Sequence, residues 1–435
     1  MSIAELYEIY KNYPSVETDS RKIKKDDLFF ALKGPNFNGN LYAEQALKDG
    51  ASYAIVDEAV ASGNSNIIVV DDVLSCLQQL AHFHRKTFDI PFIAITGSNG
   101  KTTTKELVHT VLSTQYKTYT TKGNLNNHIG VPLTLLSIKR DADVAVIEMG
   151  ANHLTEIAGY CVYTEPTIGI ITNCGKAHLE GFGSEQGVRK GKGELFDFLR
   201  AHHGTCFAFA DYPYFEDMTK GIEHQFWYSE NANSNKENLI AAGHIDKSDP
   251  FLTIKLQASH KADRTIETQL VGAYNLPNVL CAVALGRYFD IPDDSIQKAI
   301  AGYAPSNSRS QLIHKDSNQI ILDAYNANPS SMQAAILNFS KMRADHKVLI
   351  LGGMKELGHD SPAEHLKLKE LIDQTGNWKQ VILIGPEFEG IAPEYHWFKD
   401  QHEAAQSLEK APFKDSYILV KGSRSNGLEK LVDVL

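Results

Sequence analysis

The clearest sign of chemistry in this sequence is a short loop that contains two glycines. Residues 91–112 read PFIAITGSNGKTTTKELVHTVL, which is an apolar strand, a loop and a helix. Backbone N–H groups and the positive end of the helix dipole bind phosphate at such a junction. The loop lysine would neutralise the β- and γ-phosphates, and the threonine hydroxyl after it would ligate Mg²⁺. We predict a nucleotide site made by Gly97, Ser98, Asn99, Gly100, Lys101, Thr102 and Thr103.

The loop departs from the usual phosphate-binding pattern at one position. The pattern GxxxxGK[ST] requires a glycine where Ile95 stands, so the segment is a shortened variant, TGxxGKT. A plain turn between a strand and a helix is the alternative interpretation. The order of strand, loop and helix favours phosphate binding over that alternative.

Two other strand ends carry groups that could bind a metal ion. The segment DVAVIEMGA contains Glu148, and PTIGIITNCGKAHLEGFG leads into a loop with His178. Ligands of an open α/β sheet bind at the carboxyl ends of its strands, so both side chains could meet the phosphate loop. Taken alone, either residue could be an ordinary solvated or hydrogen-bonded side chain. Beside a phosphate loop, we predict that Thr102, Glu148 and His178 are ligands of Mg²⁺.

The elements that must position these residues begin with a small N-terminal unit. Residues 1–88 alternate short strands, near 28–34, 52–57 and 66–72, with a helix near 42–49. The first fourteen residues and residues 73–88 have the apolar spacing of amphipathic helices. This alternation predicts a small α/β domain.

Two larger units follow. Residues 89–303 repeat an apolar, β-branched strand and a helix, which predicts a doubly wound parallel sheet covered on both faces. A polar stretch over 304–311 then leads to the strands QIILDAY, KVLILGG, QVILIG and SYILVKG, with room for helices between them. The predicted fold class is therefore α/β in three domains: residues 1–88, a central P-loop domain over 89–303, and a Rossmann-like domain over 304–435.

Length and composition agree with this division and exclude several functions. The 435 residues correspond to three domains of about 150 residues. A net charge of −10 disfavours a protein that wraps nucleic acid, and no run approaches the roughly 18 apolar residues of a membrane span. The start lacks the basic and apolar regions of a signal peptide. Five cysteines without a CxxC pair indicate reduced, buried thiols, so we expect a cytoplasmic protein.

The chain also resembles a known family, the Mur ligases, which are ATP-dependent amide ligases of peptidoglycan precursor synthesis. The resemblance rests on eight motifs in the family's order: ITGSNGKTTTKE, GNLNNHIGVPLTLL, VIEMGANHLTEI, ITNCGKAHLEGFGS, KGKGELF, GAYNLPNVLCAVA, LDAYNANPSSMQAAI and LVKGSRSNGLEKLV. Within the family, three of them are most similar to the branch that adds D-alanyl-D-alanine to UDP-N-acetylmuramoyl-tripeptide. The resemblance therefore implies these two substrates, ATP, and two Mg²⁺ sites, with no nucleic-acid partner.

The resemblance also implies roles for residues near the phosphate loop. ATP would phosphorylate the carboxylate of the UDP-linked peptide, and the amine of the dipeptide would attack the acyl phosphate. Lys192 matches a lysine that is carbamylated in related ligases and would help hold a second Mg²⁺; an exposed lysine in a basic run is the alternative. Asn126 and Asn127 would lie near the γ-phosphate and the acceptor carboxylate, although asparagine also favours turns. Lys101, Lys192, His178 and Asn127 are the predicted catalytic set.

The resemblance also assigns roles to further residues, whose own sequence surroundings say less about function. Asn275 and Asn278 would contact the nucleotide, whereas Tyr274 replaces the histidine common in relatives. The resemblance places Arg309, Asp323 and Asn326 at the nucleotide, and assigns substrate contacts to Lys421, Ser423 and Arg424. An Asx turn and a helix N-cap would explain the asparagines of LDAYNANP equally well. Gly353 stands where many relatives have aspartate.

The N-terminal unit resembles the part of the family that holds the UDP-sugar. The hydroxyl, backbone and guanidinium groups of Thr18, Asp19, Ser20 and Arg21 suit a uridine diphosphate. A β-turn with a capping aspartate is the alternative.

Three functions remain open from the sequence. The first is the dipeptide-adding ligase described above, expected to be a monomer. The second is a ligase that adds a single amino acid, including folylpolyglutamate synthetase, which shares the core. The third is a nucleotide-binding scaffold without catalysis, which the presence of Lys101, Thr102, Glu148, His178 and Lys192 disfavours.

Overall fold

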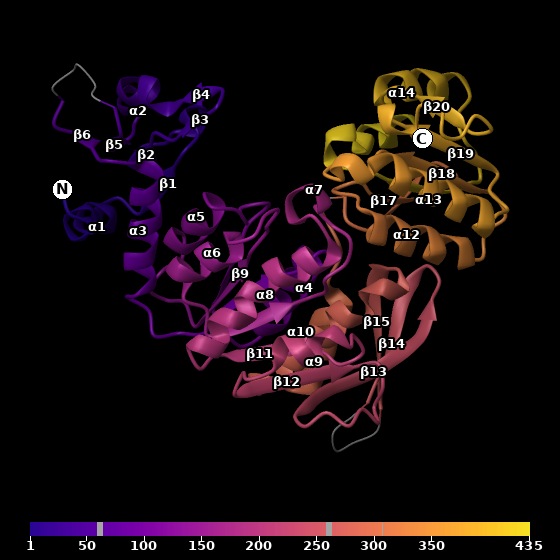
Figure 1. The fold of residues 1–435 in the computed structure, drawn as a ribbon, viewed down its shortest axis with the longest axis horizontal. Helices are drawn as coiled ribbons and strands as arrows, with labels where there is room; N and C mark the ends of the chain where they lie inside the picture. Colours follow the sequence, from indigo (N-terminus) through magenta and orange to yellow (C-terminus); the bar gives the residue numbers. More distant parts are fainter. Residues whose placement is uncertain (59–63, 258–262, 307) are drawn as a thin grey trace.

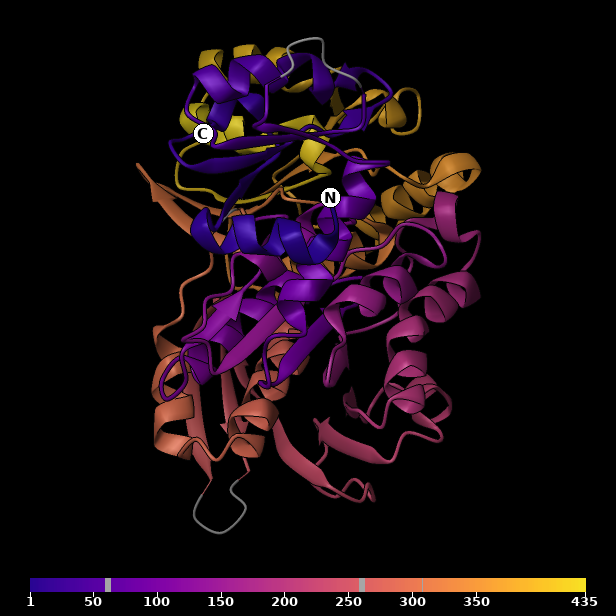
Figure 2. The same ribbon diagram turned by 90° about the vertical axis from the view of Figure 1, so that its left-hand side faces the viewer.

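The computed structural model describes residues 1–58, 64–257, 263–306 and 308–435. In these residues the chain forms three large sheets, one for each predicted part, and a small two-stranded sheet. Figure 1 shows the N-terminal and C-terminal parts above the middle part, on opposite sides. Turned by 90°, both lie above the middle part and overlap in the view (Figure 2). The three-domain α/β architecture predicted from the sequence is confirmed, and the domain boundaries remain predictions.

The N-terminal part contains a parallel sheet in the order β1-β2-β5-β6. Its elements are α1 (Ile3–Asn12), β1 (Ser15–Glu17), η1 (Ser20–Lys22), β2 (Asp27–Phe30), β3 (Lys33–Gly34), β4 (Phe37–Asn38), η2 (Gly39–Tyr42), α2 (Ala43–Lys48), β5 (Tyr53–Val56), β6 (Ile67–Val69) and α3 (Val73–Arg85). Helix α1 begins at a capping box between Ser2 and Glu5, and packs against α3. The single strand expected over 28–34 is wrong, because β2 ends at Phe30 and the chain turns into the β3–β4 hairpin.

The middle part is built on a sheet in the order β15-β14-β13-β12-β11-β10-β7-β9-β8, which is parallel from β13 to β8. Its elements are β7 (Phe92–Thr96), α4 (Lys101–Leu112), β8 (Thr118–Thr120), α5 (Gly130–Leu136), β9 (Val144–Glu148), α6 (Glu156–Thr164), β10 (Ile168–Ile171), α7 (Leu179–Phe182), α8 (Glu185–Ala201), β11 (Thr205–Phe209), α9 (Tyr214–Thr219), β12 (His224–Ser229), β13 (Leu239–Ser248), β14 (Phe251–Leu256), β15 (Arg264–Val271), η3 (Ala273–Asn275), α10 (Leu276–Tyr288) and α11 (Asp293–Gly302). Strands β7, β9, β10 and β11 are buried along their whole length, as expected for a sheet covered on both faces.

The expected alternation of strand and helix fails after β12. Strands β13, β14 and β15 are antiparallel neighbours, and the described residues form no helix between them. The burial of β15, RTIETQLV, alternates between less and more exposed positions over its first six residues. This period of two is typical of a half-exposed antiparallel strand, whereas the apolar strands around β7 are buried on both faces.

The C-terminal part has a sheet in the order β16-β17-β21-β18-β19-β20. Its elements are β16 (Gln311–Lys315), β17 (Asn318–Asp323), α12 (Pro329–Lys341), β18 (Lys347–Gly352), η4 (Gly358–Asp360), α13 (Ser361–Thr375), β19 (Gln380–Ile384), η5 (Pro386–Phe388), β20 (His396–Phe398), α14 (Gln401–Lys410), β21 (Tyr417–Lys421), η6 (Arg424–Asn426) and η7 (Leu428–Val434). The four expected strands are β17, β18, β19 and β21. The two edge strands, β16 and β20, were not predicted; β16 has five residues and is mostly half-buried, and β20 has three and is mostly exposed.

The described helices include none that is long and apolar enough to cross a membrane. All five cysteines are free and buried, as expected from their isolated positions in the sequence.

Candidate active site

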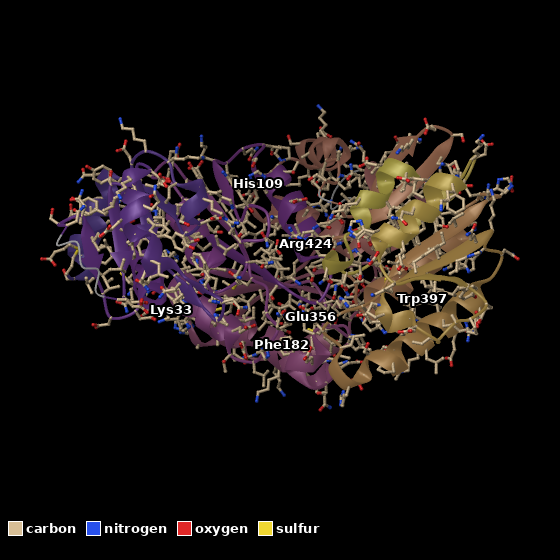
Figure 3. The ribbon with its side chains drawn as sticks, turned by 90° about the horizontal axis from the view of Figure 1, so that it is seen from above. Lys33, His109, Phe182, Glu356, Trp397 and Arg424 are labelled. Carbon is tan, nitrogen blue, oxygen red and sulfur yellow. The ribbon has the colours of Figure 1, made fainter. Side chains whose placement is uncertain are left out.

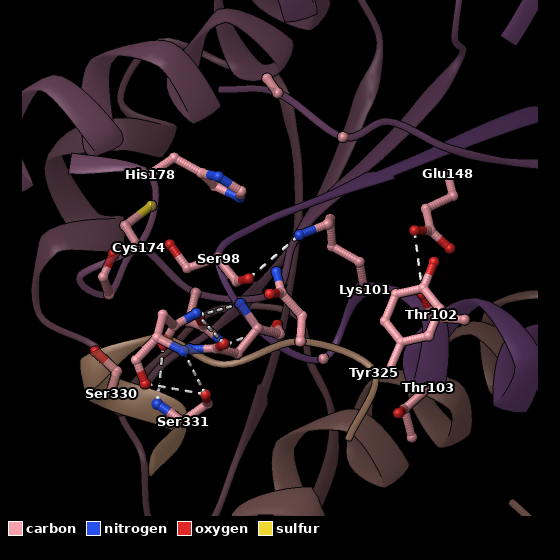
Figure 4. A pocket seen from close by; sticks show the side chains of 18 of the residues that line it. Ser98, Lys101, Thr102, Thr103, Glu148, Cys174, His178, Tyr325, Ser330 and Ser331 are labelled. Atoms are coloured by element: carbon pink, nitrogen blue, oxygen red, sulfur yellow. Dashed lines mark hydrogen bonds between the residues drawn. The ribbon is translucent and has the colours of Figure 1, made fainter. Parts of the chain in front are cut away.

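A cavity of about 770 Å³ lies where strand ends of the middle and C-terminal parts face each other. From the middle part it is lined by the phosphate loop and by residues that follow β9, β10 and β11. From the C-terminal part it is lined by residues at the ends of β17 and β21 and by the first turns of α12. Figure 4 shows Lys101 lying between His178 on one side and Glu148 on the other. We call this cavity the cleft.

The phosphate loop connects the buried strand β7 to helix α4 and requires both of its glycines. Gly97 has φ of 144° and Gly100 has φ of 79°. A Cβ on Gly97 would lie 2.0 Å from Thr172 Oγ1, and one on Gly100 would lie 2.6 Å from Asn278 Oδ1. Larger residues are therefore excluded by conformation and by space.

Asn173, at the end of the neighbouring strand, fixes the shape of this loop. Its backbone carbonyl accepts the N–H of Ser98 at 2.9 Å, and its side-chain oxygen accepts the N–H of Asn99 at 3.0 Å. Its amide group in turn donates to Asn99 O at 3.0 Å. The N–H groups at the start of α4 have no acceptor within the helix, so they are suited to bind an anion.

Lys101 lies in the first turn of α4, with its ammonium folded over the loop. Its Nζ donates to Gly97 O at 2.6 Å and to Ser98 O at 3.2 Å. Burial lowers the pKa of Lys101 to about 8. A cation held among carbonyls beside an open cavity is well placed to receive phosphate oxygens.

Glu148 ends β9 and faces the first turn of α4. Its Oε1 accepts the hydroxyl of Thr102 at 3.1 Å and the side-chain amide of Asn126 at 2.7 Å. Its Oε2 is buried and, within the described residues, has no hydrogen-bond partner, although Lys105 Nζ lies 3.7 Å away. A hydroxyl beside a carboxylate oxygen with unused capacity is a donor set that Mg²⁺ accepts, so Thr102 and Glu148 fit the expected metal.

Lys192 is buried within α8, directly behind the cleft wall. Its Nζ donates to Ala151 O at 2.8 Å and lies 5.0 Å from the centre of the Phe182 ring. Burial lowers the pKa of Lys192 well below its ordinary value. The exposed lysine considered as an alternative is therefore wrong for this residue, which is fully buried.

His178 comes from the loop before α7 and lines the cleft, with Lys101 between it and Glu148 (Figure 4). Its Nδ1 lies 2.6 Å from Glu356 Oε2 of the C-terminal part, and this neighbour lowers the pKa of the Glu356 carboxyl. Figure 3 shows Phe182 and Glu356 close together at this junction, and Glu180 N–H donates to Glu356 O at 3.3 Å. Among the described residues no three His, Cys, Asp or Glu side chains gather as a metal site. His178 and Glu148 both line the cleft, and their shared role as ligands of Mg²⁺ remains a prediction.

The C-terminal part presents a second polar cluster to the cleft. Asp323 accepts the N–H of Ser310 at 3.2 Å and the ammonium of Lys421 at 2.6 Å. The guanidinium of Arg309 lies 3.5 Å from the centre of the Tyr325 ring. Asn326 lines the cleft and its side chain accepts the N–H of Ala327.

Ser423 and Arg424 lie beside this cluster but do not line the cleft. Ser423 Oγ accepts the N–H of Lys355 at 3.0 Å, and the Arg424 guanidinium lies 5.3 Å from the Tyr325 ring centre. Their predicted contacts with substrate therefore remain predictions.

Asn275 and Asn278 line the cleft and support the start of α4 at the same time. Asn278 donates to Asn275 Oδ1 at 2.9 Å and accepts the hydroxyl of Thr104 at 3.1 Å. Tyr274, which stands where relatives commonly have histidine, pairs its hydroxyl with Ser310 Oγ at 2.9 Å. These contacts connect the middle part to the segment that leads into the C-terminal part.

The N-terminal residues proposed for the UDP-sugar do not line the cleft. Asp19 caps η1, accepts from the Arg21 side chain at 2.8 and 2.9 Å, and leaves Arg21 86% exposed. The backbone N–H of Thr18 donates to Glu17, and Ser20 begins η1. The structure thus contains the capping turn that was the alternative, and sugar binding stays a prediction.

Known proteins match nearly the whole of this chain. Family models match residues 12–85 (Mur ligase family, catalytic domain), 95–286 (Mur ligase middle domain) and 308–424 (Mur ligase, glutamate ligase domain). A relative from Bacillus subtilis is 33% identical over 96% of this chain and 92% of its own length. One from Escherichia coli is 34% identical over 97% and 93%. Both carry the name UDP-N-acetylmuramoyl-tripeptide–D-alanyl-D-alanine ligase. The chain belongs to the Mur ligase family.

Solved structures of Mur ligases share the fold. A MurF crystal structure from Acinetobacter baumannii superimposes with a TM-score of 0.85 at 28% identity, covering 96% of this chain and 92% of that one. A MurF ligase from Thermotoga maritima, solved in complex with ADP, gives 0.84 at 23% identity and covers 97% and 96%. This chain is therefore a ligase with the three-domain Mur ligase fold.

Several cleft residues of this Mur ligase were not singled out from the sequence. They are His128, Asn152, Glu156, Tyr160, Asn173, Cys174, Glu185, Arg189, Tyr212 and Tyr214. The position of Asn173 directly after an apolar strand is a signal that could have found it. Arg189 lies one helical turn before Lys192, so helical spacing could have placed both on one face. Nothing in the local sequence marks Tyr212 or Tyr214.

Proposed function

We propose that this chain joins D-alanyl-D-alanine to UDP-N-acetylmuramoyl-tripeptide with conversion of ATP to ADP and phosphate. The observation that carries the proposal is the convergence of the phosphate loop and Glu148 on one cleft, with Lys192 buried behind it and bonded to Ala151 of its wall. This constellation occurs in a chain that aligns over nearly its full length with ligases of that name.

The reaction first transfers the γ-phosphate to the carboxylate of the UDP-linked peptide, which gives an acyl phosphate. The dipeptide amine then attacks this carbonyl, and the tetrahedral intermediate collapses to an amide and phosphate. The main obstacle is the approach of a carboxylate to a triphosphate, because both are anions. Lys101, the N–H groups at the start of α4 and Arg309 supply positive charge, and asparagines at 126 and 127 orient the acceptor.

Mg²⁺ fits the oxygen atoms of Thr102 and Glu148 that face the cleft. Bound there, it would screen the charge of the phosphates. Asn126 holds the other oxygen of Glu148 in place. His178 would join such a site only after its contact with Glu356 is broken.

Lys192 suits the carbamate role that the family resemblance assigns to it. Its amine would attack carbon dioxide, form an N–C bond, and release one proton to solvent. The lowered pKa of Lys192 favours the neutral amine that this step requires. Mass spectrometry and ¹³C NMR of the protein labelled with ¹³C-bicarbonate would detect the added carboxyl group, which Lys192→Met should lack.

We extend the proposal to the remaining predicted contacts. Asn275, Asn278, Asp323 and Asn326 would contact the nucleotide, and Lys421, Ser423 and Arg424 the peptide substrates. Thr18, Asp19, Ser20 and Arg21 would hold the UDP-sugar after Arg21 is released from Asp19. Free thiols suit the cytoplasm, and a monomer suffices because one chain lines the cleft.

Purified protein tests the proposal directly. With UDP-N-acetylmuramoyl-tripeptide, ATP and Mg²⁺, we expect ADP release on addition of D-alanyl-D-alanine and formation of the UDP-pentapeptide. Release only with a single amino acid would replace the proposal by the other ligase reaction. ATP binding without acceptor-dependent turnover would identify a scaffold instead.

A further inference from the structure

The cations that line the cleft differ in whether an acidic side chain neutralises them. Lys421 is ion-paired with Asp323. In the described part of the chain, Lys101, Arg189 and Arg309 line the cleft without a carboxylate within 4.0 Å. An uncompensated cation at the wall of a ligand cavity is available to bind an anionic group of a ligand.

Arg189 is the one of these three for which neither the motifs nor the nucleotide provides a role. Its guanidinium lies 4.9 Å from the centre of the Tyr214 ring, at the start of α9. Its Nε is buried and has no hydrogen-bond partner among the described residues. A cation–π contact with an aromatic ring holds a guanidinium in place and leaves N–H groups free for a carboxylate.

The ring that carries Arg189 is itself held in place. The Tyr214 hydroxyl accepts the backbone N–H of Cys174 at 3.0 Å, next to the loop that carries His178. Tyr212 stacks on Tyr214 with ring centres 5.5 Å apart. The orientation of Arg189 is therefore set before any ligand arrives.

Glu185, the residue on α8 that is best spaced to pair with Arg189, lies near a different cation. Glu185 lies four residues earlier on α8, a spacing at which Glu and Arg commonly pair. In the structure, Glu185 Oε1 instead lies 3.9 Å from Lys176 Nζ. Arg189 thus keeps its charge free on the side of α8 that faces the cleft.

Arg189 and the phosphate loop line the same cleft, so one ligand can lie against both. The two charged ends of a dipeptide are separated by about 7 Å when the chain is extended. A dipeptide whose amine reaches the acyl phosphate near Lys101 would extend its carboxylate along the cleft wall, where Arg189 offers a cation that the phosphates do not use.

We propose that Arg189, held against the Tyr214 ring, binds the terminal carboxylate of the incoming dipeptide and so selects acceptors with a negative charge two residues from the amine. This inference rests on the proposed function, because it assigns one end of the acceptor in that reaction. Lys101 and Arg309 remain with the phosphates. A single amino acid carries its carboxylate nearer to its amine, so we expect it to gain less from Arg189.

The test compares D-alanyl-D-alanine with its C-terminal amide, which lacks the carboxylate charge. In the unaltered protein we expect kcat/KM to be about 10- to 100-fold higher for the free acid, the range of one good charged hydrogen-bonded pair. Arg189→Gln should lower the value for the acid to that for the amide. The KM for Mg-ATP and for the UDP-linked peptide should stay unchanged.

Lys190→Gln is the matched control, because it removes the same charge from an exposed neighbour on the same helix. It should keep the preference for the acid. Arg189→Lys, which keeps the charge without the planar fork, should retain part of the preference, and it decides the question if Arg189→Gln does not fold.

The outcomes separate the two proposals. An unaltered protein that does not use D-alanyl-D-alanine refutes the proposed function itself. An active protein in which Arg189→Gln keeps the ratio between acid and amide, or raises only the KM for Mg-ATP, refutes the role of Arg189.

Discussion

Two helices begin at opposite sides of the same cleft, α4 after β7 and α12 after β17, and their first turns are built differently. Gly100 caps α4 in the left-handed conformation and offers no side chain to the helix N–H groups. Asn328 caps α12 through a capping box, in which its side chain accepts the N–H of Ser331 at 2.9 Å and Ser331 Oγ accepts its N–H at 3.1 Å.

The difference separates a binding site from a supporting contact. The first turn of α4 keeps its donors for an external anion, whereas α12 uses a donor on its own cap and lacks another at Pro329. Asn328 Nδ2 also donates to Asn99 Oδ1 at 2.8 Å and thereby touches the phosphate loop across the cleft. Of two similar strand–helix junctions, one is suited to bind phosphate and the other positions it.

Removing the positive charge of Lys101, at the junction of β7 and α4, should have the largest effect on activity. We expect Lys101→Ala to lower kcat by at least about 10²- to 10³-fold, as loss of one preorganised group opposite a developing charge does. The fold should persist, because the hydrogen bonds that the Lys101 ammonium donates within the described residues go to carbonyls of the loop itself. Steady-state kinetics and circular dichroism measure both quantities, and near-normal turnover would remove Lys101 from the mechanism.

Placing a side chain at Gly100, which caps α4, should weaken nucleotide binding. Gly100→Ala forces a Cβ to 2.6 Å from Asn278 Oδ1 at a φ of 79°, so we expect a loss of about 1–3 kcal/mol in stability and weaker binding of Mg-ATP. The control is Gly390→Ala, which has φ of 72° and nothing within 4 Å of the added atom. Calorimetric titration of both variants tests this, and equal affinities would show that space at Gly100 is unimportant.

Removing the side chain of Asn328, which caps α12, should lower stability more than it lowers nucleotide affinity. We expect Asn328→Ala to lower the free energy of unfolding by about 1 kcal/mol, the usual value of a helix cap. Asn328→Ser keeps a capping oxygen but loses the donor to Asn99, so it should restore stability without restoring that contact. Urea unfolding and calorimetric titration with Mg-ATP of the two variants separate the roles, and a large fall in Mg-ATP affinity in both variants would reverse the assignment.

The smallest expected effect is on how stability changes with pH, and it comes from Lys101. Lys421 has a carboxylate partner, whereas burial among carbonyls lowers the pKa of Lys101 to about 8. Above this value the folded state releases the proton while the unfolded lysine, with a pKa of about 10.4, still binds it. Stability should therefore rise with pH in this window, by less than about 1 kcal/mol per pH unit.

The comparison for this effect is Lys101→Met, which should show a smaller rise than the unaltered protein between about pH 8 and pH 9. Urea unfolding at both pH values gives the difference. Parallel pH profiles of the two proteins would mean that Lys101 titrates as an ordinary exposed lysine.

Most of the fold and the phosphate loop could be read from the sequence because their signals are local. Buried parallel strands require continuous apolar residues, and a loop that approaches phosphate requires glycine, so residues 92–112 carry their own evidence. Strand β15 carries a weaker signal, because RTIETQLV has only Ile266, Leu270 and Val271 as apolar residues, and its alternating burial appears only in the structure.

The sequence by itself determined the three α/β units, the nucleotide loop and the family, because each depends on neighbouring residues or on motifs in order. Only the tertiary structure decided that Lys192 is buried, that His178 faces Glu356, and that Arg189 lies against the Tyr214 ring. The physical reason is that charge, burial and partner choice depend on groups brought together from distant parts of the chain. Spacing along one strand or helix contains no record of them.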